Sequence, residues 1–325
     1  MEFLIKKENK MKQKFMKVVT AFLMVASMGM FSCSNDPDIP SNEIINKDHE
    51  DPVKAELILV EGHLHGAYKF HQNPEVEGVV HLNKVQKVTI EQTEKGWHPT
   101  TESAKQFNVR STPHDAKGQN VYALWIKYYN AKGEEVTGEF VENGQDQIHQ
   151  HFFIPRDIKN TFDGVSENDD TNPATLFEYF YCDTDPWDKN RHNEGAKLIG
   201  DKNPIGLKGY FKFLKPRKQF VLNIELMHAA KSKWDAKGQA SPFYAPSLAQ
   251  RQRDHWDLKI KIPVVIYADQ MEYLETEAIE DLSESDKKLL ESIAKAYSIT
   301  PEEALEDLKT LFYGDIDPEA GSIWL

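Results

Sequence analysis

The sequence predicts a mainly β protein, with one or two antiparallel β-sandwich or barrel-like units and a C-terminal helical hairpin. Between Ala55 and Ala268, short runs rich in β-branched and aromatic residues alternate with turn residues. No long helical period interrupts these runs, which argues against an α/β fold. After residue 270 the apolar residues recur at the three-to-four-residue spacing of amphipathic helices.

Strands are predicted wherever such a run is bounded by turn residues. In chain order the runs are 57–60, 85–90, 121–129, 148–154, 176–181, 210–213, 220–227 and 258–267. The polar segment 156–173 divides them, so β domains are predicted at 55–158 and 172–270. The two halves do not align as a repeat, and one large sandwich remains the alternative.

Residues 271–325 are predicted to form the helical hairpin. Ser283, followed by Asp286 three residues later, has the spacing of a capping box. Thr300 and Pro301 begin a second helix, with Glu303 at the capping-box position. The apolar faces of the two helices are expected to pack on the sheet: Leu289, Leu290, Ile293, Ala294 and Tyr297, then Ala304, Leu305, Leu308, Leu311 and Phe312.

Residues 1–32 have the pattern of a secretory signal peptide. Six lysines precede an apolar run from Val18 to Phe31, which is too short and wrongly flanked for a membrane-spanning helix. The run ends in Met30-Phe31-Ser32-Cys33, which resembles the lipobox of bacterial lipoproteins, although Phe31 stands where that family usually has a small or β-branched residue. The resemblance implies cleavage before Cys33 and acylation of that residue.

Residues 33–54 are predicted to form a flexible tether, because Pro, Asn, Asp and Glu dominate them without any apolar period. The acidic stretch after Cys33 resembles the signal that sends some lipoproteins to the cell surface. We therefore expect an outer-membrane, lipid-anchored protein, either surface-exposed or facing the periplasm.

The charge of the chain excludes one class of partner. Its 325 residues carry 39 basic and 52 acidic groups, a formal net charge of -13, and removing residues 1–32, with six Lys and two Glu, deepens it to -17. A field of this sign repels phosphate backbones and attracts cations, so we expect no nucleic-acid partner.

Histidine carries the strongest functional signal. His63 and His65, with His71 nearby, and His149 and His151 form H-x-H pairs within predicted strands. Alternation along a strand places both imidazoles of a pair on one face. The opposite faces carry the apolar residues expected to supply the core, so two such strands side by side would present four imidazoles to one ion.

The imidazoles predict binding of zinc, copper, nickel or iron, or of a metal complex such as haem, for uptake through an outer-membrane transport receptor. Binding should weaken below about pH 6.5, since only neutral imidazole ligates a metal. His228 lies with the apolar side of its predicted strand and is expected to be a core-edge histidine. A Met227–His228 ligand pair for copper or haem is the alternative.

Oxygen donors cluster in the segment 183–190, where Asp183, Asp185 and Asp188 suggest a calcium site. The segment lacks the EF-hand pattern, and a turn in which Asp side chains bond the local backbone is the alternative. Cys182, the only cysteine besides Cys33, lies in an aromatic run and is expected to be a buried, inert thiol.

Aromatic residues support a rival function, a surface lipoprotein that stacks glycan rings on exposed platforms. The candidates are Trp97, Trp125, Trp187, Trp234 and Trp256, with Tyr128, Tyr129, Tyr179 and Tyr181. Nucleophile-elbow, Walker and dinucleotide-binding motifs are absent from the sequence, so we expect a binding protein rather than an enzyme.

Overall fold

The computed structural model of the chain describes residues 47–73, 81–82, 85–112, 121–162, 173–309 and 325. The chain divides into two compact units, Met1–Asn42 and Glu43–Leu325, and every described residue belongs to the second. The predicted signal segment 1–32 and the predicted lipidation site Cys33 therefore lie outside the described residues. Among the helices that are described, none is both long and apolar enough to cross a membrane.

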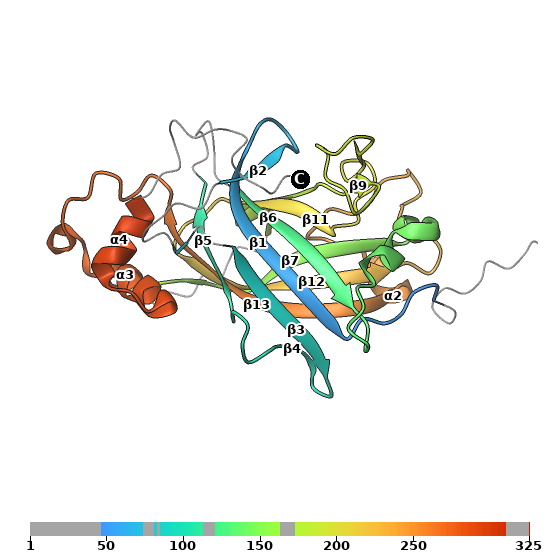
Figure 1. The fold of residues 1–325 in the computed structure, drawn as a ribbon, viewed down its shortest axis with the longest axis horizontal. Coiled ribbons are helices and arrows are strands. Elements are labelled where there is room, and N and C mark those ends of the chain that lie inside the picture. The colour runs from blue at the N-terminus through green and yellow to red at the C-terminus, as the bar shows by residue number, and fades with distance from the viewer. Residues whose placement is uncertain (1–46, 74–80, 83–84, 113–120, 163–172, 310–324) are drawn as a thin grey trace, which may run out of the picture. The chain divides into compact units, whose positions relative to one another are not determined.

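The larger of the two main sheets contains seven strands within the described residues. Its order is β4 (Gly96–Pro99), β3 (Gln86–Thr93), β1 (Lys54–Leu64), β6 (Val121–Tyr129), β11 (Lys208–Phe213) and β8 (Phe177–Tyr181), with β2 (Phe70–Gln72) paired to β1. All of its pairings are antiparallel. β1 and β6 lie side by side along their length in Figure 1.

The smaller main sheet has the order β5 (Phe107–Ser111), β13 (His255–Asp269), β12 (Lys218–His228) and β7 (His149–Asn160). β12 is antiparallel to both of its neighbours, whereas β5 is parallel to β13. A short ribbon of β9 (Thr184–Asp185) and β10 (Lys197–Leu198) completes the sheets.

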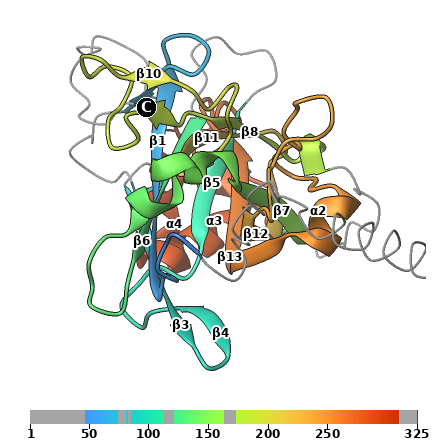
Figure 2. The same ribbon diagram turned by 90° about the vertical axis from the view of Figure 1, so that its right-hand side faces the viewer.

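The two main sheets enclose one hydrophobic core. Leu57 and Leu59 of β1 belong to the same buried cluster as Leu222 and Ile224 of β12. Figure 2 shows β1 and β6 on one side of that core and β7, β12 and β13 on the other. The predicted mainly β fold with antiparallel sheets and a helical C-terminal region is confirmed.

The predicted division into β domains at 55–158 and 172–270 is wrong. Strands β8 and β11, from the second half of the chain, complete the sheet that β1 begins. Strands β5 and β7, from the first half, flank β13 and β12. The polar segment 156–173, taken as a domain boundary, instead begins inside β7, and each sheet needs both halves for its hydrogen-bond partners.

The predicted runs all fall on strands, and the run 121–129 coincides with β6. The strands without a prediction are β2, β4, β5, β9 and β10, which have five residues or fewer. Runs this short cannot show an alternating pattern long enough to be recognised in sequence.

The C-terminal helices begin where their caps predict. Ser283 caps α3 (Glu284–Tyr297) in a complete capping box with Asp286. The Thr300 hydroxyl accepts from the Glu303 amide at the start of α4 (Pro301–Lys309), and the Glu303 carboxylate accepts from the Thr300 amide. Their apolar faces pack on Val265, Tyr267 and Ala268 of β13 (Figure 1). Leu311 and Phe312 lie outside the described residues.

The remaining helical elements are short: α2 (Leu248–Arg253) and the 3₁₀ turns η1 (Thr137–Phe140), η2 (Glu142–Gln147), η3 (Pro173–Thr175) and η4 (Ile279–Asp281). Cys182 is buried with a free thiol, and burial raises the pKa of that thiol. The prediction that Cys182 is buried is confirmed.

Candidate metal centres

A buried group of four side chains gathers at one end of the smaller sheet. His149 of β7 and His228 of β12 stand directly opposite each other in the antiparallel ladder. Both are fully buried. Because directly opposed residues of an antiparallel pair share a face of the sheet, the register itself brings the two imidazoles together.

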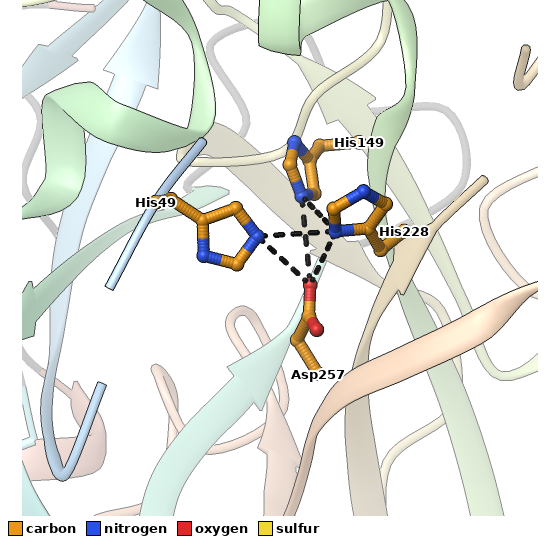
Figure 3. A group of neighbouring side chains, drawn as sticks. All are labelled: His49, His149, His228 and Asp257. Atoms are coloured by element: carbon orange, nitrogen blue, oxygen red, sulfur yellow. Dashed lines mark hydrogen bonds and ion pairs between the residues drawn. The ribbon is translucent and has the colours of Figure 1, made fainter. Parts of the chain in front are cut away.

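A β-bulge adds a carboxylate to this pair. Leu226 and Met227 are consecutive in β12, but their partners in β13 are Leu258 and Trp256. Asp257 is therefore the extra residue of the bulge. A bulge re-aims a side chain that strict alternation would turn the other way. The Asp257 carboxylate is directed at His149 and His228, and its side chain is inaccessible to solvent (Figure 3).

The fourth member, His49, comes from the segment before β1. Its side chain is buried and lies against Phe140, with ring centroids 4.5 Å apart. The neighbouring Glu50 amide donates to the Glu139 carboxylate of η1. Residues 47–54, predicted to be the end of the flexible tether, are thus held against the sandwich. The prediction is wrong for these residues because, although His49 and Pro52 are buried, the segment shows no apolar period that would indicate packing.

The distances within this His49–His149–His228–Asp257 group match a tetrahedral ion. His228 Nδ1 lies 3.1 Å from His49 Nε2, 3.2 Å from His149 Nε2 and 3.2 Å from Asp257 Oδ2. His49 Nε2 and His149 Nε2 each lie 3.5 Å from the same carboxylate oxygen. Zinc bonds of about 2.0–2.1 Å to nitrogen and oxygen give tetrahedral edges of about 3.3–3.4 Å, whereas square-planar or octahedral neighbours would be about 2.9 Å apart.

The hydrogen bonds around the group fix the tautomers of two histidines. His49 Nδ1 donates to the Glu50 carbonyl at 3.2 Å, and His149 Nδ1 donates to the Gln145 carbonyl at 3.0 Å. A carbonyl only accepts, so both Nδ1 atoms carry the hydrogen and both Nε2 atoms present a lone pair. Metal-ligating histidines are oriented by this kind of outer hydrogen bond.

Lone pairs and a carboxylate oxygen therefore face one another in a buried space. Burial raises the pKa of the Asp257 carboxyl, whereas the Lys47 ammonium that donates to the carboxylate lowers it and keeps the group ionised. Burial lowers the pKa of His149 to about 4, so this imidazole is neutral at pH 7. A cation at the centre would remove the repulsion between these acceptors.

Lys47 supports the carboxylate from behind. Its ammonium donates to Asp257 Oδ1 at 2.6 Å and to Asp51 at 2.6 Å. Oδ2 is left for the three histidines. The group thus has the two parts of a metal site, a converging ligand set and partners that orient the ligands.

A second group, His63, His65 and His71, lies at the hairpin between β1 and β2. His65 Nε2 is 3.1 Å from His63 Nε2 and 3.3 Å from His71 Nδ1. His71 is buried, His63 is half-buried and His65 is exposed. The prediction that these three histidines lie together agrees with this geometry.

The predicted single site made by both H-x-H pairs is wrong. His63 and His65 converge with His71, whereas His149 converges with His49, His228 and Asp257, and His151 belongs to neither group. The apolar residues opposite each pair also do not supply the main core. They pack in small separate clusters, such as Ile148, Phe152 and Ile154 with Met227, and the histidine faces continue the inward sides of their strands.

His151 has a structural role instead of a ligand role. Its Nδ1 donates to the Ile205 carbonyl at 2.7 Å, and its Nε2 accepts from the Tyr128 hydroxyl at 2.6 Å. Both ring nitrogens are thereby satisfied, and burial lowers the pKa of His151 to about 3. Gly206, with φ of 90°, leaves room for this ring, because an added Cβ would lie 2.8 Å from the Cβ of His151.

The segment proposed for calcium uses its first aspartate as a backbone anchor. The buried Asp183 carboxylate accepts from the four successive amides of residues 205–208 at 2.8–3.2 Å. Asp185 and Asp188 are exposed. In the part of the chain that the structure describes, these three aspartates are not among the side chains whose ligand atoms converge.

The aromatic candidates divide into core and surface. Tyr128, Tyr179 and Tyr181 are buried in the main core, and Tyr129 donates to Glu56. Trp97 packs on that core, and Arg251 covers Trp256. Trp125 and Trp187 line one groove of about 720 Å³, whereas Trp234 lines a different pocket together with Tyr179 and Tyr181. Five of the nine aromatic candidates thus line one or the other of these two pockets.

His49 and Asp257 were not predicted as ligands from the sequence, and His228 was predicted to be a core-edge histidine. His49 lies among acidic residues, Asp48, Glu50 and Asp51, and this neighbourhood of a lone histidine was the available signal. Asp257 follows His255 and Trp256 at the start of a strand, where no periodicity reveals a bulge. His228 faces the core as expected, but beside two histidines.

Comparisons with protein-family models, with curated proteins and with solved structures give no match. The function is therefore inferred from the geometry of the site.

Proposed function

We propose that this protein binds one divalent transition-metal ion, most favourably zinc, through His49 Nε2, His149 Nε2, His228 Nδ1 and Asp257 Oδ2. The single observation that supports this most is the set of five ligand-to-ligand distances between 3.1 and 3.5 Å. Three nitrogen donors and one oxygen donor, with five of the six distances near tetrahedral edges, suit zinc, which proteins usually bind with four tetrahedral ligands.

Other ions fit this group less well. Copper(II) and nickel(II) favour tetragonal arrangements, with neighbouring ligands about 2.9 Å apart and opposed ligands about 4 Å apart. Haem would need axial ligands on opposite sides of a flat macrocycle. Ligand atoms at 3.1–3.5 Å leave no slot for a porphyrin between them.

The place of this function is the cell envelope. The signal-like segment and Cys33 support a lipid anchor in the outer membrane, and the net charge of -17 after removal of residues 1–32 draws cations to the surface. In this proposal the protein serves metal uptake, with a transport receptor in the same membrane as its partner.

Metal content of the purified protein tests the buried site. The native chain should retain one more zinc ion per molecule than Asp257→Asn, a variant that keeps the shape of the side chain and removes its charge. Asp185→Asn, the same change at an exposed position, should retain the native content. Equal metal content in the native protein and Asp257→Asn would refute the proposal.

A second candidate function, glycan binding, is supported by one observation, the groove that Trp125 and Trp187 share. Lys127, Glu135 and Asn190 also line it and supply hydrogen-bonding groups. Binding of oligosaccharides that is lost in Trp187→Ala would favour this function.

A further inference from the structure

The hairpin between β1 and β2 brings three histidines into one small volume. His63 and His71 are directly paired in the ladder. His65 follows at the turn, where its amide donates to the Lys69 carbonyl at 2.8 Å. The three ligand nitrogens all lie within 4.8 Å of one another. A hairpin of this kind fixes its side chains more firmly than a free loop would.

Gly62 makes this close approach of the two strands sterically feasible. A Cβ at Gly62 would lie 2.2 Å from the His71 carbonyl oxygen and 2.4 Å from the Phe70 ring. Any larger residue would push β2 away from β1. The backbone approach that places His71 beside His63 thus depends on a residue without a side chain.

An outer hydrogen bond also orients this group. His63 Nδ1 donates to the Asn73 amide oxygen at 2.8 Å, which leaves the lone pair of His63 Nε2 directed at His65. Asn73 is itself held in place, since its backbone N–H donates to the Glu61 backbone carbonyl. A satisfied outer partner distinguishes a built ligand set from a chance meeting of surface histidines.

The two histidine groups are far apart. Tyr128, which packs against Phe140 beside the buried group, pairs with Ala55 of β1. Eight residues at about 3.3 Å each separate Ala55 from His63, so the groups lie roughly 25 Å apart. One ion cannot serve both, and each group can be tested separately.

We propose that His63, His65 and His71, the three converging ligands at this hairpin among the residues that the structure describes, form a second transition-metal site whose ion keeps a coordination position for a further ligand. The distances of 3.1 and 3.3 Å fit two edges of one face of a zinc tetrahedron. Zinc sites with three protein ligands characteristically hold water or another small ligand in the fourth position. The exposed His65 places this position at the surface, where the ion can be accepted from solution and passed on.

This site goes beyond the proposed function, because it uses other residues and exchanges its ion instead of retaining it. The probe is zinc itself, removed from the loaded protein by excess chromophoric chelator. Two ions per chain should leave in two phases, with the fast phase at least about 100 times faster than the slow one.

Variants assign the phases. His65→Gln, at an exposed position that should tolerate the change, should abolish the fast phase and leave the slow one unchanged. Asp257→Asn should abolish the slow phase only. His98→Gln, an exposed histidine that contacts the Lys95 carbonyl in its own turn, should change neither phase. A fast phase that persists in His65→Gln, or the release of only one ion from the native protein in the slow phase, would overturn the second site.

Cobalt(II) gives an independent readout of the open position. In Asp257→Asn loaded with cobalt, added imidazole should change the visible absorption of the bound ion. In His65→Gln loaded with cobalt, the same addition should leave the spectrum unchanged. If the cobalt spectrum of Asp257→Asn does not change when imidazole is added, the open coordination position is refuted. If the native protein instead released a single ion, in the fast phase only, the buried site would be refuted and the second site would stand.

Discussion

The two histidine groups use the same side chain in opposite settings. The buried group draws His49, His149, His228 and Asp257 from separate parts of the chain, whereas the open group takes His63, His65 and His71 from one hairpin. The buried group is completed by a carboxylate and closed by Phe140, but His65 of the open group faces solvent. The larger number of ligands and the deeper burial therefore predict that the buried group retains its ion, whereas the open group exchanges its ion.

The largest expected effect comes from Asp257. Asp257→Asn removes the only charged ligand of the buried group and should weaken zinc binding there by more than about 100-fold, since even outer partners of metal ligands contribute 10–100-fold. Competition titration with a chelator of known affinity measures it. The open group, roughly 25 Å away by strand length, should keep its affinity. A parallel loss at both groups would show that the two are coupled.

Removal of the metal should show how much each group's ion contributes to the free energy of unfolding. An ion at 100 times its dissociation constant raises the free energy of unfolding by about 2.7 kcal/mol. Chelation of the native protein should lower the denaturant midpoint accordingly. In Asp257→Asn the part of this loss that comes from the buried ion should disappear, and in His65→Gln it should remain. A loss in Asp257→Asn as large as the loss in the native protein would contradict the buried ion.

Acid should destabilise the metal-free protein through its buried histidines. Burial lowers the pKa of His149 to about 4 and of His151 to about 3, below the ordinary 6.5 that the unfolded chain retains. Above pH 6.5 neither state binds these protons, and the stability is unchanged. Between pH 6.5 and 4 the unfolded chain takes up protons that the folded chain does not, so the free energy of unfolding falls by up to about 1.4 kcal/mol per pH unit for each group.

Denaturant unfolding at pH 7, 6 and 5 measures this effect. In His151→Gln the free energy of unfolding should fall less steeply with decreasing pH. That variant should also lower stability at pH 7 by roughly 1–3 kcal/mol, because glutamine does not reproduce the geometry in which the imidazole binds both the Ile205 carbonyl and the buried Tyr128 hydroxyl. Its zinc affinity should equal the native value at both groups. Loss of metal from His151→Gln would return His151 to the ligand set and contradict the account of the buried group.

The smallest effects are expected from the outer hydrogen bonds. Lys47→Met should weaken the buried group about 10-fold, and Asn73→Ala should weaken the open group by a similar factor. Each variant should leave the other group unchanged. Calorimetric zinc titrations measure both constants. A change in the zinc affinity of the buried group in Asn73→Ala would mean that the hairpin and the buried group are energetically coupled.

The fold was largely predictable because its signals are local. Alternation over 121–129 locates β6, and the Ser283 and Thr300 caps locate α3 and α4. Strand order was not predictable from the same signals. Pairing between β1 and β6, or β7 and β12, depends on long-range contacts, and a polar segment such as 156–173 does not reveal whether it ends a domain or a strand.

The candidate sites were predictable to the extent that their residues are neighbours in sequence. His63, His65 and His71 lie within nine residues, and the H-x-H spacing pointed to them. His49, His228 and Asp257 are brought together by strand register, a β-bulge and a polar segment that folds back on the sheet. His149 was selected for a pair with His151, yet its true partner is the residue opposite in β12.

The most direct test of the central claim is X-ray absorption spectroscopy at the zinc edge of His65→Gln, in which the buried group is the only proposed site. The account predicts one ion per chain, with four nitrogen and oxygen ligands at about 2.0–2.1 Å and the outer-shell scattering of three imidazoles. A six-coordinate shell, fewer than three imidazoles, or the absence of a stoichiometric ion would contradict it.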